Sequence, residues 1–171
     1  MLSKMSISSS VFCILILTFG VSAQNTKLTR RTALTKLMSC SERPIKDFLV
    51  CEDYASFLEK RFEKGDRSLL GPLLEAGLKS DGALSEELGT FYADVLWRET
   101  RLFLTTLSRR SPRDQKTLSM LAVRADGGGN TETWNREIRS RLKTIVAQNR
   151  GLASTARICL HQLDVFLAEN H

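Results

Sequence analysis

Two acidic side chains, Glu87 and Asp94, have the spacing in this chain that comes closest to a catalytic pair. They lie seven residues apart, which on a helix is two turns, or about 10 Å along one face. Carboxylates at roughly that separation can cut a glycosidic bond, one as general acid and the other as base or nucleophile. The surrounding Glu86-Glu87-Leu88-Gly89 segment lacks the Glu-Ser context of lysozyme-like enzymes. We therefore expect solvated helix surface here, with peptidoglycan-type hydrolysis as the alternative.

His161 is the other residue that could take part in proton transfer. Asp164, one turn later on a helix, could orient its ring, and Arg157 lies one turn before it. No nucleophile lies beside it on that face, because Cys159 is two positions away and points elsewhere. The chain also lacks a Gly-x-Ser-x-Gly hydrolase motif. We expect a structural or surface histidine, and no catalytic residue and no cofactor are predicted.

A metal site is not expected either. Asp126, Asn130 and Glu137 fall at the first, fifth and twelfth positions of a calcium-loop pattern. However, Gly128 and Thr131 stand where a ligand and the turn glycine are needed. The segment from Asp126 to Asn130, with three consecutive glycines, is predicted to be a flexible connector. Zinc is disfavoured because no two cysteines are closely spaced.

A basic stripe on one predicted helix is the candidate binding surface. Arg136, Arg139 and Lys143 share a face, and Trp134 lies at the start of the same helix. Such a stripe could bind an acidic surface, with Trp134 as an aromatic anchor if it is exposed. Alternatively, these side chains form an ordinary solvated outer face, because the opposite face is needed for the core.

The cysteines predict one disulfide bond in an oxidising compartment. Cys40 and Cys51 flank a Ser-Glu-Arg-Pro turn and form the preferred pair. Cys51 with Cys159 is the competing pair, because both lie on apolar helical stripes and would tie the first long helix to the last. The odd cysteine would be a free thiol or would pair between chains.

These residues are positioned by a chain that is predicted to be helical almost throughout. Apolar residues recur at three- and four-residue steps in seven or eight segments, no alternating strand pattern stands out, and three prolines can all open helices. We expect a single compact all-α domain of antiparallel neighbours over residues 24–171. In length and leucine-rich faces, the helices between Ser68 and Leu107 resemble the stacked helix pairs of HEAT-like α-solenoids. That resemblance implies a protein-binding surface.

The first 23 residues predict export. Lys4 precedes an apolar run from Val11 to Phe19, and Val21-Ser22-Ala23 provides a small-residue cleavage site, so we expect removal after Ala23. The run is too short to cross a bilayer, and no later stretch could act as a transmembrane segment. The remaining 24 basic and 19 acidic side chains give a net charge of about +5. In an exported protein this favours anionic envelope components or acidic proteins over nucleic acid as partners.

Together these patterns predict an exported, non-catalytic helical interaction protein, either periplasmic or secreted. The lack of an Asn-x-Ser/Thr site after Ala23 favours a bacterial envelope protein over a glycosylated secreted one. A second alternative to enzymatic function is a small apolar ligand held between helices, which requires an internal cavity.

Overall fold

A computed structural model describes residues 28–41, 48–125 and 131–170 of the 171-residue chain. Within these ranges the chain forms eight α-helices and one 3₁₀ turn, without a strand, which confirms the all-α prediction. The elements are α1 (Arg30–Ser41), α2 (Phe48–Glu63), η1 (Arg67–Leu69), α3 (Leu70–Lys79), α4 (Gly82–Arg98), α5 (Thr100–Leu107), α6 (Pro112–Arg124), α7 (Glu132–Gln148) and α8 (Ala153–Glu169).

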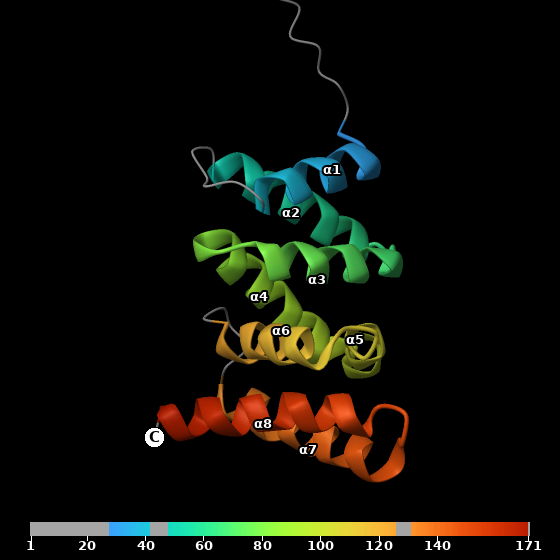
Figure 1. Cartoon of the computed structure of the whole chain (residues 1–171), viewed down its shortest axis with the longest axis vertical. Coiled ribbons are helices and arrows are strands. Elements are labelled where there is room, and N and C mark those ends of the chain that lie inside the picture. Colours follow the sequence, from blue (N-terminus) through green and yellow to red (C-terminus); the bar gives the residue numbers. More distant parts are fainter. Residues whose placement is uncertain (1–27, 42–47, 126–130, 171) are drawn as a thin grey trace, which may run out of the picture.

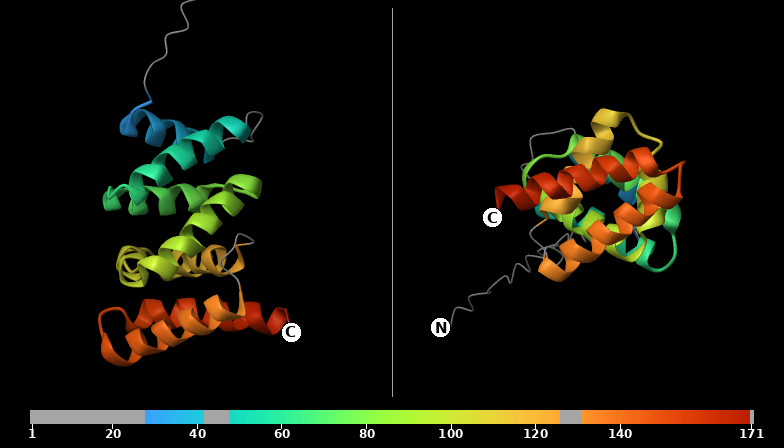
Figure 2. Two further views of the ribbon diagram at one scale, coloured as in Figure 1. Left: turned by 180° about the vertical axis from the view of Figure 1, so that it is seen from behind. Right: turned by 90° about the horizontal axis from the view of Figure 1, so that it is seen from below.

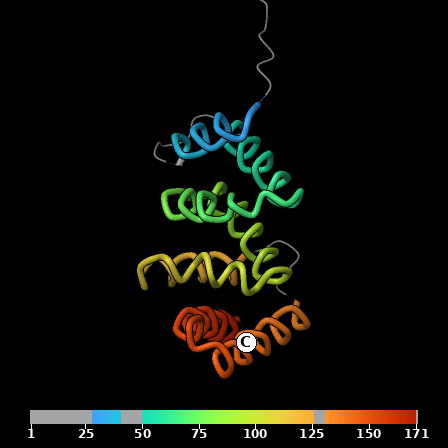
Figure 3. The backbone as a smooth tube through the Cα atoms, turned by 90° about the vertical axis from the view of Figure 1, so that its right-hand side faces the viewer, coloured from blue at the N-terminus to red at the C-terminus, as the bar shows by residue number. Residues whose placement is uncertain are grey.

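The helices stack in successive layers along the long axis of the molecule (Figure 1). α1 and α2 form one end, α3 and α4 follow, then α5 and α6, and the α7–α8 hairpin forms the other end (Figures 1 and 2). α2, α4, α6 and α8 contact one another in order along the stack, and α1 contacts α3, which contacts α5. The stacked arrangement predicted for the middle of the chain therefore extends over all the described helices, as the side view in Figure 3 also shows.

Several helix boundaries follow from local sequence signals. Ser111 caps α6, since its Oγ accepts a hydrogen bond of 3.2 Å from the Asp114 backbone N–H, and Pro112 follows at the first helical position. Thr131 caps α7 in the same way, through the backbone N–H of Trp134. Gly65, with a φ of 106°, ends the second helix in the left-handed conformation that glycine favours. Pro44, one of the three prolines that can open helices, lies outside the described residues.

The core runs through the whole stack and is made largely of leucine and aromatic side chains. Tyr92 of α4 is fully buried, and its hydroxyl donates a hydrogen bond of 2.6 Å to the Leu73 carbonyl of α3. Gly77 leaves the space for this ring, because a Cβ there would lie 2.2 Å from the Tyr92 oxygen. α3 and α4 therefore pack through one closely fitted contact.

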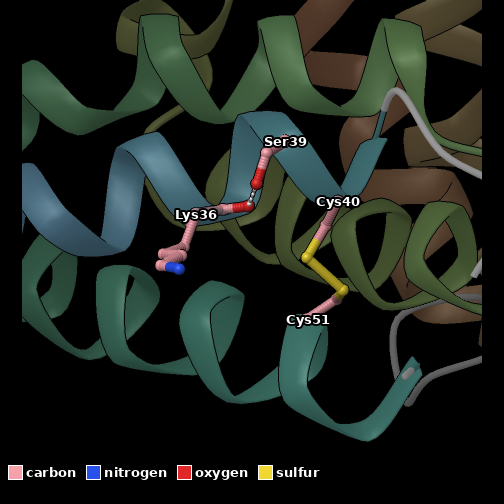
Figure 4. The surroundings of a disulfide bond; sticks show 4 residues. All are labelled: Lys36, Ser39, Cys40 and Cys51. Carbon is pink, nitrogen blue, oxygen red and sulfur yellow. Dashed lines mark hydrogen bonds between the residues drawn. A yellow bond between two sulfur atoms is a disulfide. The ribbon is translucent and has the colours of Figure 1, made fainter. Parts of the chain in front are cut away.

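A disulfide joins the first two helices. Cys40 near the end of α1 is bonded to Cys51 in the first turns of α2, with 5.9 Å between their Cα atoms (Figure 4). The preferred pairing is confirmed and the Cys51–Cys159 alternative is excluded. Cys159 is a buried free thiol that lies 3.0 Å from the Ser119 hydroxyl of α6. Burial raises the pKa of this thiol to about 12, so it is not a reactive nucleophile.

Candidate functional site

One candidate site is a surface groove between the start of α7 and the end of α8. We call it the α7–α8 groove. It has a volume of about 550 Å³ and is bordered on α7 by Glu132, Asn135, Arg136 and Arg139 and on α8 by Phe166, Leu167 and Asn170. The antiparallel hairpin brings these two helix ends side by side (Figure 1). Two residues of the predicted basic stripe thus border a hollow, together with apolar side chains from the neighbouring helix.

Asn135 is the unusual member of this groove. Only 9% of the residue is exposed, and its Oδ1 has no hydrogen-bond partner within the described part of the chain. A buried amide oxygen without a partner costs about 1–3 kcal/mol, and most buried polar groups in proteins are paired. The helix places it there, because Asn135, Ile138 and Leu142 follow each other at three- and four-residue steps on the buried face.

The basic stripe does not act as one continuous surface. Arg139 donates hydrogen bonds through Nε and Nη2 to Asp164 Oδ1 of α8, so its charge is largely committed to the hairpin. Arg136 is 68% exposed, and its nearest acidic oxygen, on the 96% exposed Glu132, is 4.0 Å away. Lys143 is exposed and pairs with no acidic side chain among the described residues. Arg136 and Lys143 are therefore the members available to a partner.

Trp134 lies beneath this surface. It is 5% exposed, and its ring stacks on Trp97 of α4 with 6.4 Å between ring centroids. The Arg141 guanidinium lies over the Trp97 ring at 4.8 Å and donates a hydrogen bond to the Trp97 carbonyl. Trp134 thus has a packing role in the described structure, and Trp97 is half-buried.

A second group of polar residues lies between α2 and α4. This acidic cluster comprises Glu52, Asp53, Glu59, Glu63 and Glu87. Glu59 Oε1 and Glu87 Oε2 are buried without a hydrogen-bond partner in the described residues. Burial, followed by the Glu87 and Glu63 charges, raises the pKa of Glu59 to about 8. Burial, followed by the Glu52 and Asp53 charges, raises the pKa of Glu87 to about 7. The Glu87 charge, once formed, opposes ionisation of Glu59.

Glu87 and Asp94, the two carboxylates with the spacing of a catalytic pair, lie in different surroundings on α4. Asp94 forms an ion pair of 2.7 Å with Arg98, one turn further along α4. Glu87 faces the acidic side chains of α2 instead. Glu59 is a further carboxyl of α2 that the Glu87 charge affects. The helical period of α2 indicates its buried position, because Glu59 lies between Ala55 and Phe62 at three- and four-residue steps.

The remaining candidates have few contacts with one another. His161 is exposed on α8, and its expected partner Asp164 binds Arg139. Asp126 to Asn130 lie outside the described residues, and Glu137 pairs with Arg141 at 3.4 Å. Over the described ranges, no three His, Cys, Asp or Glu side chains are grouped so that they could hold a metal ion. None of the described helices is long and apolar enough to cross a membrane.

The chain matches no protein-family model, and no curated protein and no solved structure is significantly similar to it. Its function must therefore be inferred from the geometry of the described residues.

Proposed function

We propose that this chain is an exported, non-catalytic interaction module that binds a partner protein of the cell envelope or extracellular space through the α7–α8 end of its helix stack. The α7–α8 groove is the observation that carries this proposal. There the exposed guanidinium of Arg136 lies beside the buried amide of Asn135, whose oxygen has no hydrogen-bond partner among the described residues. Binding sites combine a hollow with a few placed polar groups, and a ligand can supply the missing partner of an unpaired one.

The stacked architecture supports this function. In a stack, each layer exposes its outer edges, so a small chain presents an extended surface to a partner. The net positive charge favours partners with acidic groups, and export, which the first 23 residues predict, would place such partners in the envelope or outside the cell.

The proposal is tested by affinity capture from an envelope extract of the cells that make the protein. The bait is the processed chain, and the variant is Arg136→Glu with Lys143→Glu, which leaves the Arg139–Asp164 pair intact. We expect the variant to lose the partners that the unaltered chain retains. The matched control is Arg113→Glu with Lys116→Glu on α6, which makes the same charge change at exposed residues. Identical partners for all three baits would contradict the proposal.

A second candidate function is hydrolysis with Glu87 as general acid. It is favoured by the pKa of about 7 at this carboxyl, which would leave much of it protonated at neutral pH. A turbidity assay on purified peptidoglycan tests it. Clearing that is abolished by Glu87→Gln and retained by Asp94→Asn would establish this function, and the absence of clearing by the unaltered chain would dismiss it.

A further inference from the structure

The partner chemistry of the α7–α8 groove can be inferred from three features, beginning with Asn135. An amide side chain offers one acceptor and two donor hydrogens, which is the complement of a peptide group. Asn135 lines the groove, and its Oδ1 is buried without a hydrogen-bond partner among the described residues, so an occupant that reaches this oxygen must supply an N–H or O–H donor. The backbone N–H of a bound polypeptide meets this need, whereas the acyl chain and carboxylate of an ionised fatty acid do not.

Arg136 is the second feature. Its guanidinium lies one residue after Asn135 at the groove edge, and among the described residues the highly exposed Glu132 carboxylate, at 4.0 Å, is the one acidic group nearby. A guanidinium binds carboxylates through paired N–H donors. Arg139 borders the same hollow but is held by Asp164, so one strongly basic group is free for one carboxylate. The first turns of α7 add the positive end of a helix dipole.

The third feature is the apolar wall. Phe166 and Leu167 of α8 border the groove opposite Asn135 and Arg136 and are both partly exposed. A volume of about 550 Å³ lies within the range of small-ligand sites. It suits the end of a chain, with one apolar side chain, better than a docked helix or a long strand.

We infer that the α7–α8 groove binds the C-terminus of a partner polypeptide that ends in an apolar residue, an inference that rests on the proposed function. The terminal carboxylate binds Arg136, the last backbone N–H donates to Asn135 Oδ1, and the terminal side chain packs on Phe166 and Leu167. Capture of a free C-terminus is one of the recurrent ways in which proteins recognise peptides.

The test measures binding of the processed chain to dye-labelled pentapeptides by fluorescence anisotropy. The probes are Gly-Ser-Gly-Ser-Leu with a free C-terminus, the same peptide amidated, a version ending in serine, and an amidated peptide with an internal aspartate. We expect the free leucine-ending peptide to bind at least tenfold more tightly than each of the other probes. Equal binding of the free and amidated peptides, preference for the internal aspartate, or no binding at millimolar peptide would each overturn the inference.

Variants assign the contacts. Arg136→Gln and Asn135→Leu should each weaken binding of the free leucine-ending peptide at least tenfold, and Arg157→Gln, an exposed arginine of α8 outside the groove, should leave it unchanged. Thermal unfolding of Asn135→Leu should show a Tm no lower than that of the unaltered chain, so that lost binding is not lost folding. Displacement of the peptide by dodecanoate that persists in Asn135→Leu would instead indicate an apolar ligand and overturn the inference.

These outcomes separate the inference from the proposed function. If the processed chain captures envelope proteins in a way that depends on Arg136 and Lys143 but binds none of the peptides, the interaction module stands and the C-terminal recognition fails. If neither partners nor peptides bind, both fail.

Discussion

Replacement of Asn135 by an apolar residue should stabilise the chain, whereas most substitutions of buried residues destabilise it. Because the Asn135 Oδ1 is buried without a partner in the described part of the chain, Asn135→Leu should raise the free energy of unfolding by about 1 kcal/mol. Urea unfolding at neutral pH measures the change. Asn149→Leu is the matched control, because the Asn149 Oδ1 accepts a hydrogen bond of 3.2 Å from the Leu152 backbone N–H and its loss should destabilise the chain. A loss of stability in Asn135→Leu would show that the Asn135 amide forms stabilising hydrogen bonds in the folded chain.

The raised pKa of the buried Glu59 carboxyl should make the stability of the chain depend on pH. The pKa of this carboxyl rises from 4.5 to about 8 on folding, so between these pH values the folded chain holds a proton that the unfolded chain has released. The free energy of unfolding should therefore fall as pH rises through this window, by an amount on the order of 2 kcal/mol once partial exposure is considered. Glu87 should add to the fall up to about pH 7.

Glu59→Gln tests this dependence. The variant should be more stable than the unaltered chain at pH 9 and should show a flatter pH profile between pH 5 and 9, measured by urea unfolding at each pH. Glu132→Gln is the control, because this carboxylate is 96% exposed. A profile for Glu59→Gln that parallels that of the unaltered chain would contradict the buried, protonated state of Glu59.

The sequence could locate some of these residues but not their surroundings. Helical periodicity puts Asn135 and Glu59 on or beside apolar faces, and that position alone marks them as unusual. Whether a polar group on such a face has a partner depends on the opposing helix, which periodicity does not identify. For this reason periodicity predicts the basic stripe as one surface. In the structure, Arg139 is hydrogen-bonded to Asp164 of α8, whereas Arg136 and Lys143 remain available to a partner.

At the scale of the elements, the contact between α3 and α4 gives the clearest prediction. Gly77→Ala should destabilise the chain by about 2–3 kcal/mol, because the new methyl group would overlap the Tyr92 hydroxyl oxygen, 2.2 Å from the Cβ position. Adding Tyr92→Phe should recover part of this loss, since the oxygen is removed while the ring carbons remain 3.0 Å from the same Cβ position. Thermal unfolding of the two single variants and the double variant measures the coupling. Additive effects would contradict it.

Helix boundaries followed from the sequence where a local signal defines them. Ser111, Pro112 and Gly65 can be recognised in the sequence as helix signals because caps and left-handed turns depend on a few neighbouring residues. The relation between α5 and α6 did not follow. Antiparallel neighbours were expected, but α5 is seen nearly end-on in Figure 1 while α6 lies across the view, so the short turn between them is a corner. Long-range pairs such as Arg110 with Glu75 fix that corner, and no local signal encodes them.

At the scale of the whole molecule, layered packing predicts that stability is distributed unevenly. The disulfide closes a loop between residues 11 positions apart and stabilises the chain by about 3 kcal/mol in the chain-entropy model. Because α1 and α2 pack chiefly on each other and on η1, α3 and α4, that stabilisation belongs to one end of the stack.

The variant Cys40→Ser with Cys51→Ser tests this distribution by hydrogen exchange. We expect the backbone N–H groups of α1 and α2 to exchange markedly faster, and those of α6 and α8 to change little. Ser39→Ala, next to the disulfide in Figure 4, is the control that leaves the bond intact. A uniform acceleration along the chain would mean that the layers open as one cooperative unit.

The pairing of Trp97 with Trp134 gives the molecule a built-in optical reporter. These are the two tryptophans of the chain, and their rings stack between α4 and α7, so intrinsic emission senses a single junction. If the α7–α8 hairpin detaches, both indoles become hydrated and their emission shifts to longer wavelength, whereas fraying of α1 and α2 leaves the spectrum unchanged. If tryptophan fluorescence and far-UV circular dichroism are recorded together during unfolding, the first reports detachment of the α7–α8 hairpin and the second reports loss of helix in the whole chain.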